Sequence, residues 1–414
     1  MNGFAILSRG ISEFNLKIFI YCTVRFAKMF RNCMDKLVSL FNAQIREVSE
    51  GGVFVFLRKI FKLFLIPLVL LIVVLVRLLR PFILIRFGMF NSARIGSFSY
   101  YPEMYLCHRD QGLWDGRRIF DIFYCGRIIS NHQLKKMWGR VLYIAPFSRF
   151  VYLVDFINRL FPRYQEHEIP WFHWNLHVFL RCKSPHIFFT LEEKRRGESG
   201  KKNLGIPEDA SFVCFVARDP AYLNTIMPGN NFYYHNYRNC SIHNYLSAME
   251  KLTKKGYFAI RMGVAPKDPL VTDNPMIIDY AAKYRNDFMD IYLNANGRFF
   301  VSSSTGIDEV PRIFRNLSVV LVNFIPLEAL KYIGITKLFI PKKLWLRSEG
   351  RLLRFKEIFD SDIASFYMTE QYDAHGIEVL ENTPEEITAV VLEAEEIING
   401  TWREDKEGEE KVKG

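Results

Sequence analysis

Hydroxyl side chains gather in one short stretch of the 414-residue chain, Ser302–Gly306, which reads SSSTG. An apolar run precedes it, and apolar residues at helical spacing follow it from Ile307 to Phe314. The pattern predicts a strand, a turn and a helix. Such a turn places hydroxyls and unpaired backbone N–H groups at a helix N-terminus, where a phosphate or pyrophosphate binds well. A serine that caps a buried helix explains the same residues equally well.

Arginines follow two other apolar runs that read as strands. The run 211–217 ends at Arg218 and Asp219, and the run 257–260 ends at Arg261. Neighbouring strand ends in an open α/β sheet form one ligand-binding edge, so we expect these residues beside the hydroxyl-rich turn, where they would clamp a diphosphate. The residues expected to hold it are Arg218, Arg238, Asn239, Arg261, Gly263, Ser302, Ser303, Ser304, Thr305, Gly306 and Glu309.

The order of apolar runs and helical periodicities indicates an α/β fold. After residue 203, strands and helices alternate, which is typical of a doubly wound parallel sheet. Before it, Phe82–Phe87 reads as a buried strand, and a polar loop at 88–96 follows, as at the start of a Rossmann-like half. Further strands are expected at 104–107 and 141–144, and helices at 149–160, 171–180 and 241–254.

The domain organisation follows from changes in composition. The charged, glycine-containing run 192–203 has no periodicity and reads as a linker. We therefore expect membrane-associated helices at 1–80, an N-terminal Rossmann-like domain at 81–200, a C-terminal one at 201–400 and a charged tail at 401–414. The chain is acidic from Glu381 onward, so we expect a solvated helix there and disorder after Thr401.

Positive charge is concentrated near the N-terminus. The chain carries a formal charge of +11, and residues 1–100 hold 14 Lys and Arg against 4 Asp and Glu. Residues 24–41 have the periodicity of a basic amphipathic helix, and Leu63–Val76 is an uncharged run between basic flanks. A spanning helix needs about 20 apolar residues, so this run is short for a simple crossing.

We expect peripheral or single-pass attachment to an anionic membrane surface, because basic and strongly apolar segments stand side by side. Helices packed on the protein's own core are the alternative. The sequence has no nucleic-acid-binding motif that would assign the positive charge to DNA or RNA, so we expect no nucleic acid as a partner.

Cysteines and histidines give little sign of a metal. The seven cysteines include no C-x-x-C pair, which favours a reducing compartment over a disulfide framework or a zinc knuckle. His173 and His177 stand four residues apart, so a shared helix face could present both to a metal. Their aromatic neighbours favour packing or contact with an acceptor, and we predict no metal site.

Three ordered blocks resemble regions of a family of glycosyltransferases associated with bacterial surface polysaccharide genes. They are 213–223, 234–263 and 289–314, and the stretch 82–106 resembles that family's opening strand and loop. More distantly, the second half is similar to the GDP-fucose fucosyltransferase superfamily, in which an H-x-R motif contacts the donor diphosphate. Arg218 matches that arginine, and Ser303–Gly306 matches a later serine-containing turn.

The resemblance implies a GT-B architecture, in which an acceptor domain and a nucleotide-sugar domain face each other across a cleft. It implies transfer, with inversion, of a sugar from a GDP- or UDP-linked donor to a glycan or polyprenyl-linked acceptor in surface polysaccharide synthesis. A membrane-attached enzyme with a basic N-terminus would act at the cytoplasmic face of the bacterial inner membrane.

Glycosyl transfer leaves negative charge on the donor diphosphate, which a metal or fixed cations must stabilise. No D-x-D pair follows a predicted strand, and arginines do, so we expect transfer without an obligatory metal. We assign catalysis to Arg218, Asp219 and His235. The base that activates the acceptor hydroxyl stays open between Asp219, His235, Glu103 and His108.

A rival interpretation is a membrane-associated protein that binds nucleotide sugars, or serves as a scaffold, without turnover. It is favoured by Val216, which stands where the H-x-R motif has histidine. A third interpretation, an NAD-dependent Rossmann enzyme, is disfavoured because no G-x-G-x-x-G follows a strand.

Overall fold

The computed structural model describes residues 52–53, 65–221, 229, 231–332 and 336–403. The chain divides into two compact units, Met1–Arg77 and Leu78–Gly414. In the first unit, residues 65–77 are helical, in agreement with the apolar helix expected there. No helix in the described part of the chain combines the length and apolar character that a membrane crossing requires. The amphipathic helix expected at 24–41 and the tail after residue 403 lie outside the described residues.

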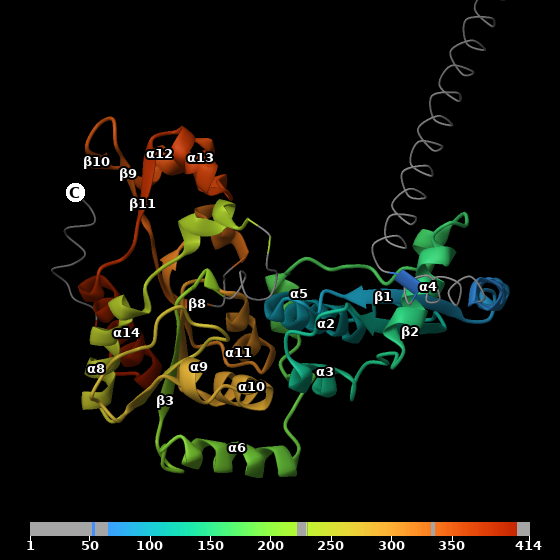
Figure 1. Cartoon of the computed structure of the whole chain (residues 1–414), viewed down its shortest axis with the longest axis horizontal. Helices are drawn as coiled ribbons and strands as arrows, with labels where there is room; N and C mark the ends of the chain where they lie inside the picture. Colours follow the sequence, from blue (N-terminus) through green and yellow to red (C-terminus); the bar gives the residue numbers. More distant parts are fainter. Residues whose placement is uncertain (1–51, 54–64, 222–228, 230, 333–335, 404–414) are drawn as a thin grey trace, which may run out of the picture. The chain divides into compact units, whose positions relative to one another are not determined.

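A six-stranded parallel sheet forms the centre of the C-terminal half of the second unit (Figure 1). Its strands are β3 (Phe212–Val216), β4 (Phe258–Arg261), β5 (Ile277–Ile278), β6 (Phe299–Ser302), β7 (Val319–Phe324) and β8 (Thr336–Pro341). In space they run β5-β4-β3-β6-β7-β8. The chain builds outward from β3 in one direction and from β6 in the other, so the predicted doubly wound parallel sheet is confirmed.

Helices cover both faces of this sheet, which explains why its strands read as continuous apolar runs. Val213 and Phe215 share a core with α8 (Leu246–Lys254) and α14 (Pro384–Asn399). The alternate residues Cys214 and Val216 face a second core, to which α10 (Asp287–Asn296) and α11 (Glu309–Ile313) contribute. Figure 1 shows α8 and α14 on one side of β3 and α10 and α11 on the other.

The acidic helix expected after Glu381 is α14, and it is not solvated on all sides. A capping box at Thr383 and Glu386 starts it, and Gly400 ends it in the left-handed conformation. Ile387 and Val391 are fully buried against the sheet. The acidic composition of the segment concealed this apolar stripe, so the expectation of a solvated helix was wrong.

The N-terminal half of the second unit contains a smaller sheet. Strands β1 (Leu84–Phe90) and β2 (Ile119–Cys125) pair in parallel, and single bridges join Phe87 to Glu168 and Phe123 to Ile144. The helices of this half are α2 (Ile95–Asp110), α3 (His132–Trp138), α4 (Ser148–Asn158) and α5 (Leu176–Arg181). The strand expected at 141–144 is reduced to the bridge at Ile144, so only part of a Rossmann-like half is present.

Other local predictions fail for identifiable reasons. The strand expected at 104–107 is part of α2, because a short apolar run fits a buried helix as well as a strand. The polar loop is shorter than expected, since β1 continues to Phe90. The helix expected at 171–180 begins only at Leu176, so His173 and His177 do not share a helix face. The helix expected at 149–160 is confirmed as α4.

The expected linker is the helix α6 (Leu191–Asn203), which starts with a capping box at Thr190 and Glu193. Its glycines allow close packing on α10. A Cβ at Gly197 would lie 2.1 Å from the ring of Tyr292, and one at Gly200 would lie 2.4 Å from the sulfur of Met289. The glycines that suggested a flexible segment therefore serve a tight helix contact.

The remaining elements complete the second unit. They are the antiparallel strands β9 (Lys343–Leu346), β10 (Arg351–Leu352) and β11 (Ile377–Leu380), and the short helices α9 (Tyr280–Lys283), α12 (Phe355–Phe359) and α13 (Thr369–Ala374). The predicted helix 241–254 consists of a 3-10 turn, Ile242–Tyr245, and α8. One continuous core contains Phe90 and Trp138 of the N-terminal half together with Phe212 and Phe300 of the large sheet.

Candidate functional site

The candidate site lies where the strand order of the large sheet reverses. β3 and β6 are neighbours, and their last residues, Val216 and Ser302, are paired in register. A cavity of about 520 Å³ opens beyond these carboxyl ends, at the position where doubly wound sheets bind ligands. The predicted residues that line it are Arg218, Asp219, His235, Arg238, Arg261, Gly263, Ser304, Thr305, Gly306 and Glu309.

Three predicted residues are not part of the cavity lining. Ser302 is fully buried, and its Oγ donates to Asp308 at 3.2 Å. Ser303 Oγ accepts a hydrogen bond from the backbone N–H of Arg218 at 2.8 Å. The carbonyl of Asn239 accepts from Lys342 Nζ at 2.5 Å. These residues hold the site together and do not contribute to its surface.

Three arginines that line the cavity have no carboxylate partner among the described residues: Arg94, Arg218 and Arg238. Burial, together with the charges of Arg238 and Arg94, lowers the pKa of Arg218 to about 10. Arg238 donates to the carbonyl of Ser304 at 2.5 Å, but its Nε has no partner in the described structure, and neither has Nε of Arg218. Mutual repulsion of this kind is relieved when an anion binds, so the cluster suits a di- or polyphosphate.

His235 lies among these arginines and is neutral at physiological pH. Burial, together with the charges of Arg218, Arg238 and Arg94, lowers its pKa to about 4. Its Nδ1 is buried and has no hydrogen-bond partner in the described residues. A neutral imidazole with a free ring nitrogen can accept a proton or a hydrogen bond from a bound ligand.

Arg261 and Asp219 line the cavity with their functional groups already engaged. Arg261 is 4 % exposed, and its Nη1 donates to the carbonyl of Asp268 at 2.6 Å and to Asp279 at 3.4 Å. Asp219 accepts from the backbone N–H groups of Ala221 and Lys267, one with each oxygen. The positive charge of Arg261 is therefore compensated by Asp279. Asp219 holds the backbone at Ala221 and Lys267 in place.

The cavity lining also contains the half-buried carboxylate of Glu309 and the buried guanidinium of Arg312. Arg312 donates from Nη1 to Glu309 Oε1 at 2.8 Å. Oε2 of Glu309 and both Nε and Nη2 of Arg312 have no partner in the described structure. Burial raises the pKa of the adjacent Asp308 to about 7. This part of the lining therefore offers both acceptors and donors to a polar ligand.

The turn after β6 leads into a 3-10 turn, Gly306–Asp308, and then into α11, which has only five residues. The longer helix that starts at the cavity is α2, with sixteen residues and no side chain that caps its N-terminus. Its first turn lines the cavity at Ile95, Gly96 and Ser97. The main helix dipole at the cavity is thus that of α2, whereas the sequence suggested the helix after the SSSTG turn.

Sequence reasoning missed several lining residues, chiefly from the N-terminal half. They are Arg94, Gly96, Ser97, Tyr100, Ser130 and Trp174, together with Arg312. The polar loop after β1 was visible in the sequence, but nothing local assigned it to this site. Arg312 is 5 % exposed, but it stands off the stripe formed by Ile307, Val310 and Phe314, so the local periodicity gave no sign of its burial.

The other two base candidates lie outside the cavity. Glu103 is fully buried and contacts His186 and Arg315. His108 stacks on Phe172, with ring centroids 3.9 Å apart. Neither residue belongs to the lining of the cavity.

Comparison with known proteins gives two remote likenesses. No family model and no curated protein matches the chain. A family 9 glycosyl transferase from Veillonella parvula is 8 % identical, with a TM-score of 0.39, over 62 % of this chain and 86 % of that one. The E. coli ADP-heptose LPS heptosyltransferase II is 11 % identical, with a TM-score of 0.36, over 75 % of this chain and 100 % of that one. Similarity to the GDP-fucose enzymes stays a prediction.

Proposed function

We propose that the protein transfers a sugar from a GDP- or UDP-linked donor to a glycan or lipid-linked glycan in surface polysaccharide synthesis. One observation carries the proposal. Buried polar atoms without a partner in the described structure gather at the switch-point cavity, on Trp174, Arg218, His235, Arg238, Glu309 and Arg312. Buried polar groups are normally satisfied, so this cavity is built for a polar, anionic ligand. The assignment of a sugar donor rests on the sequence resemblance.

In the proposed reaction the acceptor hydroxyl oxygen attacks the anomeric carbon of the donor, with inversion. The bond from that carbon to the diphosphate oxygen breaks, and its electron pair stays on the nucleoside diphosphate. Arg218, Arg238 and Arg94 stabilise the developing charge, and the N-terminus of α2 adds its dipole. Because these cations are fixed before the reaction, the proposed transfer needs no metal at the donor site.

His235 is the proposed general base, which takes the proton of the acceptor hydroxyl. It is neutral, its Nδ1 has no partner in the described structure, and it lies beside the arginines that are proposed to hold the leaving group. The backbone contacts of Asp219 favour a role in shaping the loop. Glu309 is proposed to bind a sugar or ribose hydroxyl through its unpartnered Oε2, and Tyr100 and Trp174 to form the acceptor side.

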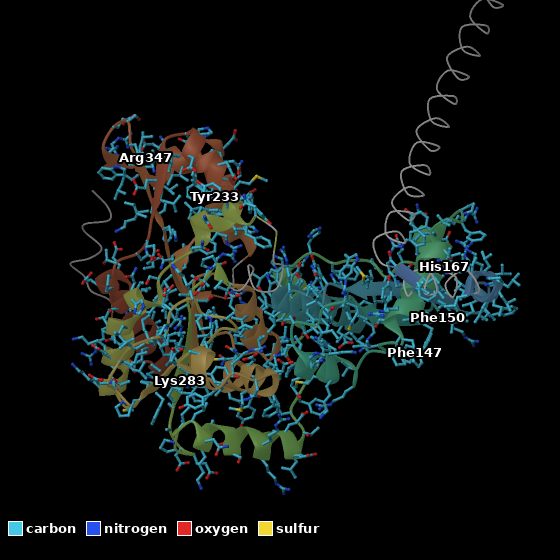
Figure 2. All side chains as sticks on the ribbon, in the orientation of Figure 1. Phe147, Phe150, His167, Tyr233, Lys283 and Arg347 are labelled. Atoms are coloured by element: carbon cyan, nitrogen blue, oxygen red, sulfur yellow. The ribbon has the colours of Figure 1, made fainter. Side chains whose placement is uncertain are left out.

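We also propose that the protein acts at the cytoplasmic face of the bacterial inner membrane. An exposed apolar surface on α4 and the residues around it supports the attachment to a membrane. Phe147, which is labelled in Figure 2 beside Phe150, is 75 % exposed, and Leu160 is 69 % exposed. Tyr152 and Phe156 are exposed on α4 as well, and the exposed Arg149 and Arg163 flank them. Exposed aromatic residues beside cations suit an anionic lipid surface.

The second candidate is a protein that binds nucleotide sugars without turnover, which Val216 in place of a histidine favours. An assay of hydrolysis or transfer of GDP- and UDP-sugars by the detergent-purified chain distinguishes the enzyme from the binding protein. Binding shown by a thermal shift, with no product formed from any donor, would favour the binding protein. If the chain neither binds nor hydrolyses any nucleotide sugar, both candidate functions are refuted. Added Mg²⁺ or Mn²⁺ should leave the rate unchanged.

A further inference from the structure

Helix α2 and the chain after α5 bring metal-binding side chains together outside the cavity. Glu103 and Cys107 are one turn apart on α2, and their ligand atoms and a ring nitrogen of His186 all lie within 4.8 Å of one another. Cys182 adds a second thiol close to this group, and Gln111 Nε2 lies 3.7 Å from its Sγ. The same Sγ lies 3.7 Å from the carbonyl oxygen of Cys107. A carboxylate, the thiol of Cys107 and an imidazole therefore face one another, and the thiol of Cys182 lies beside them.

Glu103 is left poorly satisfied in this arrangement. It is 0 % exposed, and its Oε1 accepts from His186 Nδ1 at 2.9 Å and from Arg315 Nη2 at 2.5 Å. Its other oxygen, Oε2, is buried and has no partner in the described structure. A buried carboxylate oxygen without a partner costs stability, so one atom of the cluster needs a ligand that the described protein groups do not supply.

We propose that Glu103, Cys107, Cys182 and His186 bind a divalent metal ion, for which zinc is the best match. Thiolate, imidazole and carboxylate are the ligands zinc takes, and four of them with no open position make a structural site. The ion would satisfy Oε2 of Glu103. This inference goes beyond the proposed function and does not rest on it.

The surroundings of the cluster fit such an ion. Asp110 Oδ2 lies 2.9 Å from Nε2 of His186, so it can accept the Nε2–H and leave Nδ1 to the metal. The dication and the Arg315 guanidinium together balance the two thiolates and the carboxylate of Glu103. Arg315 also donates to the carbonyl of Cys182 at 2.8 Å. A bound ion would tie α2, whose first turn lines the cavity, to the segment after α5.

The test is metal analysis of the full chain, purified without a polyhistidine tag, by plasma mass spectrometry. We expect about one zinc per chain, the stoichiometry of a closed structural site. Cys107→Ser and His186→Ala should each lower the zinc content at least about tenfold, because each removes a ligand. Cys125→Ser is the matched control, since Cys125 is another buried free cysteine and lies outside the cluster.

A second measurement keeps the proposal testable if a ligand variant fails to fold. Cobalt added to the metal-depleted chain should give a thiolate-to-cobalt charge-transfer band. Asp110→Asn, which keeps all four ligands, should weaken zinc binding about 10–100-fold. The absence of both zinc and the cobalt band would overturn the proposal, and so would Cys107→Ser that retains its zinc. None of these readouts uses sugar transfer, so failure here and failure of the proposed function are distinguishable.

Discussion

The backbone of Gly96 meets the backbone of Gly306 beside the cavity that both residues line. A Cβ on Gly96 would lie 2.8 Å from the Cα of Gly306, and a Cβ on Gly306 would lie 3.0 Å from the N of Gly96. Gly96 is in the first turn of α2, and Gly306 follows β6. The two halves of the site therefore touch at two glycines, because a Cβ on either residue would lie too close to the backbone of the other.

Gly306→Ala should separate these two backbones. Because neither side of the contact is a flexible side-chain end, we expect a loss of about 1–3 kcal/mol in the free energy of unfolding. Nucleotide-sugar affinity should fall as well, since α2 and the turn both line the cavity. Denaturant titration and calorimetric binding measure the two effects. Gly139→Ala is the control, because a Cβ there meets its nearest atom at 3.4 Å. Equal stability of the two variants would contradict the close contact.

Arg218→Ala should lower turnover about 100-fold or more, the scale of losing one preorganised charge donor. Arg218→Lys should recover only part of the rate, because lysine lacks the planar fork of arginine. The control is Arg347→Ala, at an exposed arginine labelled in Figure 2. Steady-state turnover rates of the variants with the best donor measure these effects. If Arg218→Ala turned over as fast as the control, Arg218 would have no part in stabilising the leaving group.

The low pKa of His235, about 4, should couple binding of the donor to uptake of a proton. A bound diphosphate offsets the charges of the nearby arginines and should raise this pKa toward its usual value of about 6.5. The complex then holds more protons than the free protein, so affinity should rise as the pH falls from about 7 to about 5. A nucleotide sugar is the right probe, because its diphosphate is esterified at both ends and keeps its charge over this range.

Calorimetry in two buffers with different ionisation enthalpies measures the proton uptake directly. His235→Asn should remove it. This variant also isolates His235 from Asp308, whose pKa of about 7 falls near the same range. If the variant takes up as many protons as the natural chain, the linkage belongs to another group.

Substitution of the exposed aromatic residues on and beside α4 should weaken membrane binding. In flotation with anionic phosphatidylglycerol vesicles, the double variant Phe147→Ser and Phe156→Ser should lower the partition coefficient about tenfold, because burial of aromatic side chains supplies part of the binding free energy. Phe355→Ser is the control at another exposed phenylalanine. An unchanged partition coefficient would exclude this surface, and high salt should weaken binding through the arginines.

Much of the large sheet could be predicted because its signals are local. Runs such as 211–217 and 319–322 are apolar on both strand faces, and helices alternate with them. The order of runs and helices also placed Arg218 and the SSSTG turn at strand ends. In the N-terminal half the same reasoning failed, because α2 is buried on most sides and reads like a strand at 104–107. The glycines of α6 read like a linker because their partners, Tyr292 and Met289, are far away in the chain.

The sequence by itself determined which strand ends carry arginines and hydroxyls, since that depends on residues adjacent in the chain. Only the tertiary structure decided which of those groups are available to bind an anionic ligand. Arg261 is compensated by Asp279, whereas Arg218 and Arg238 are joined by Arg94 from the other half of the unit. Electrostatic compensation and close backbone contact act through space between residues far apart in sequence, so no local pattern reports them.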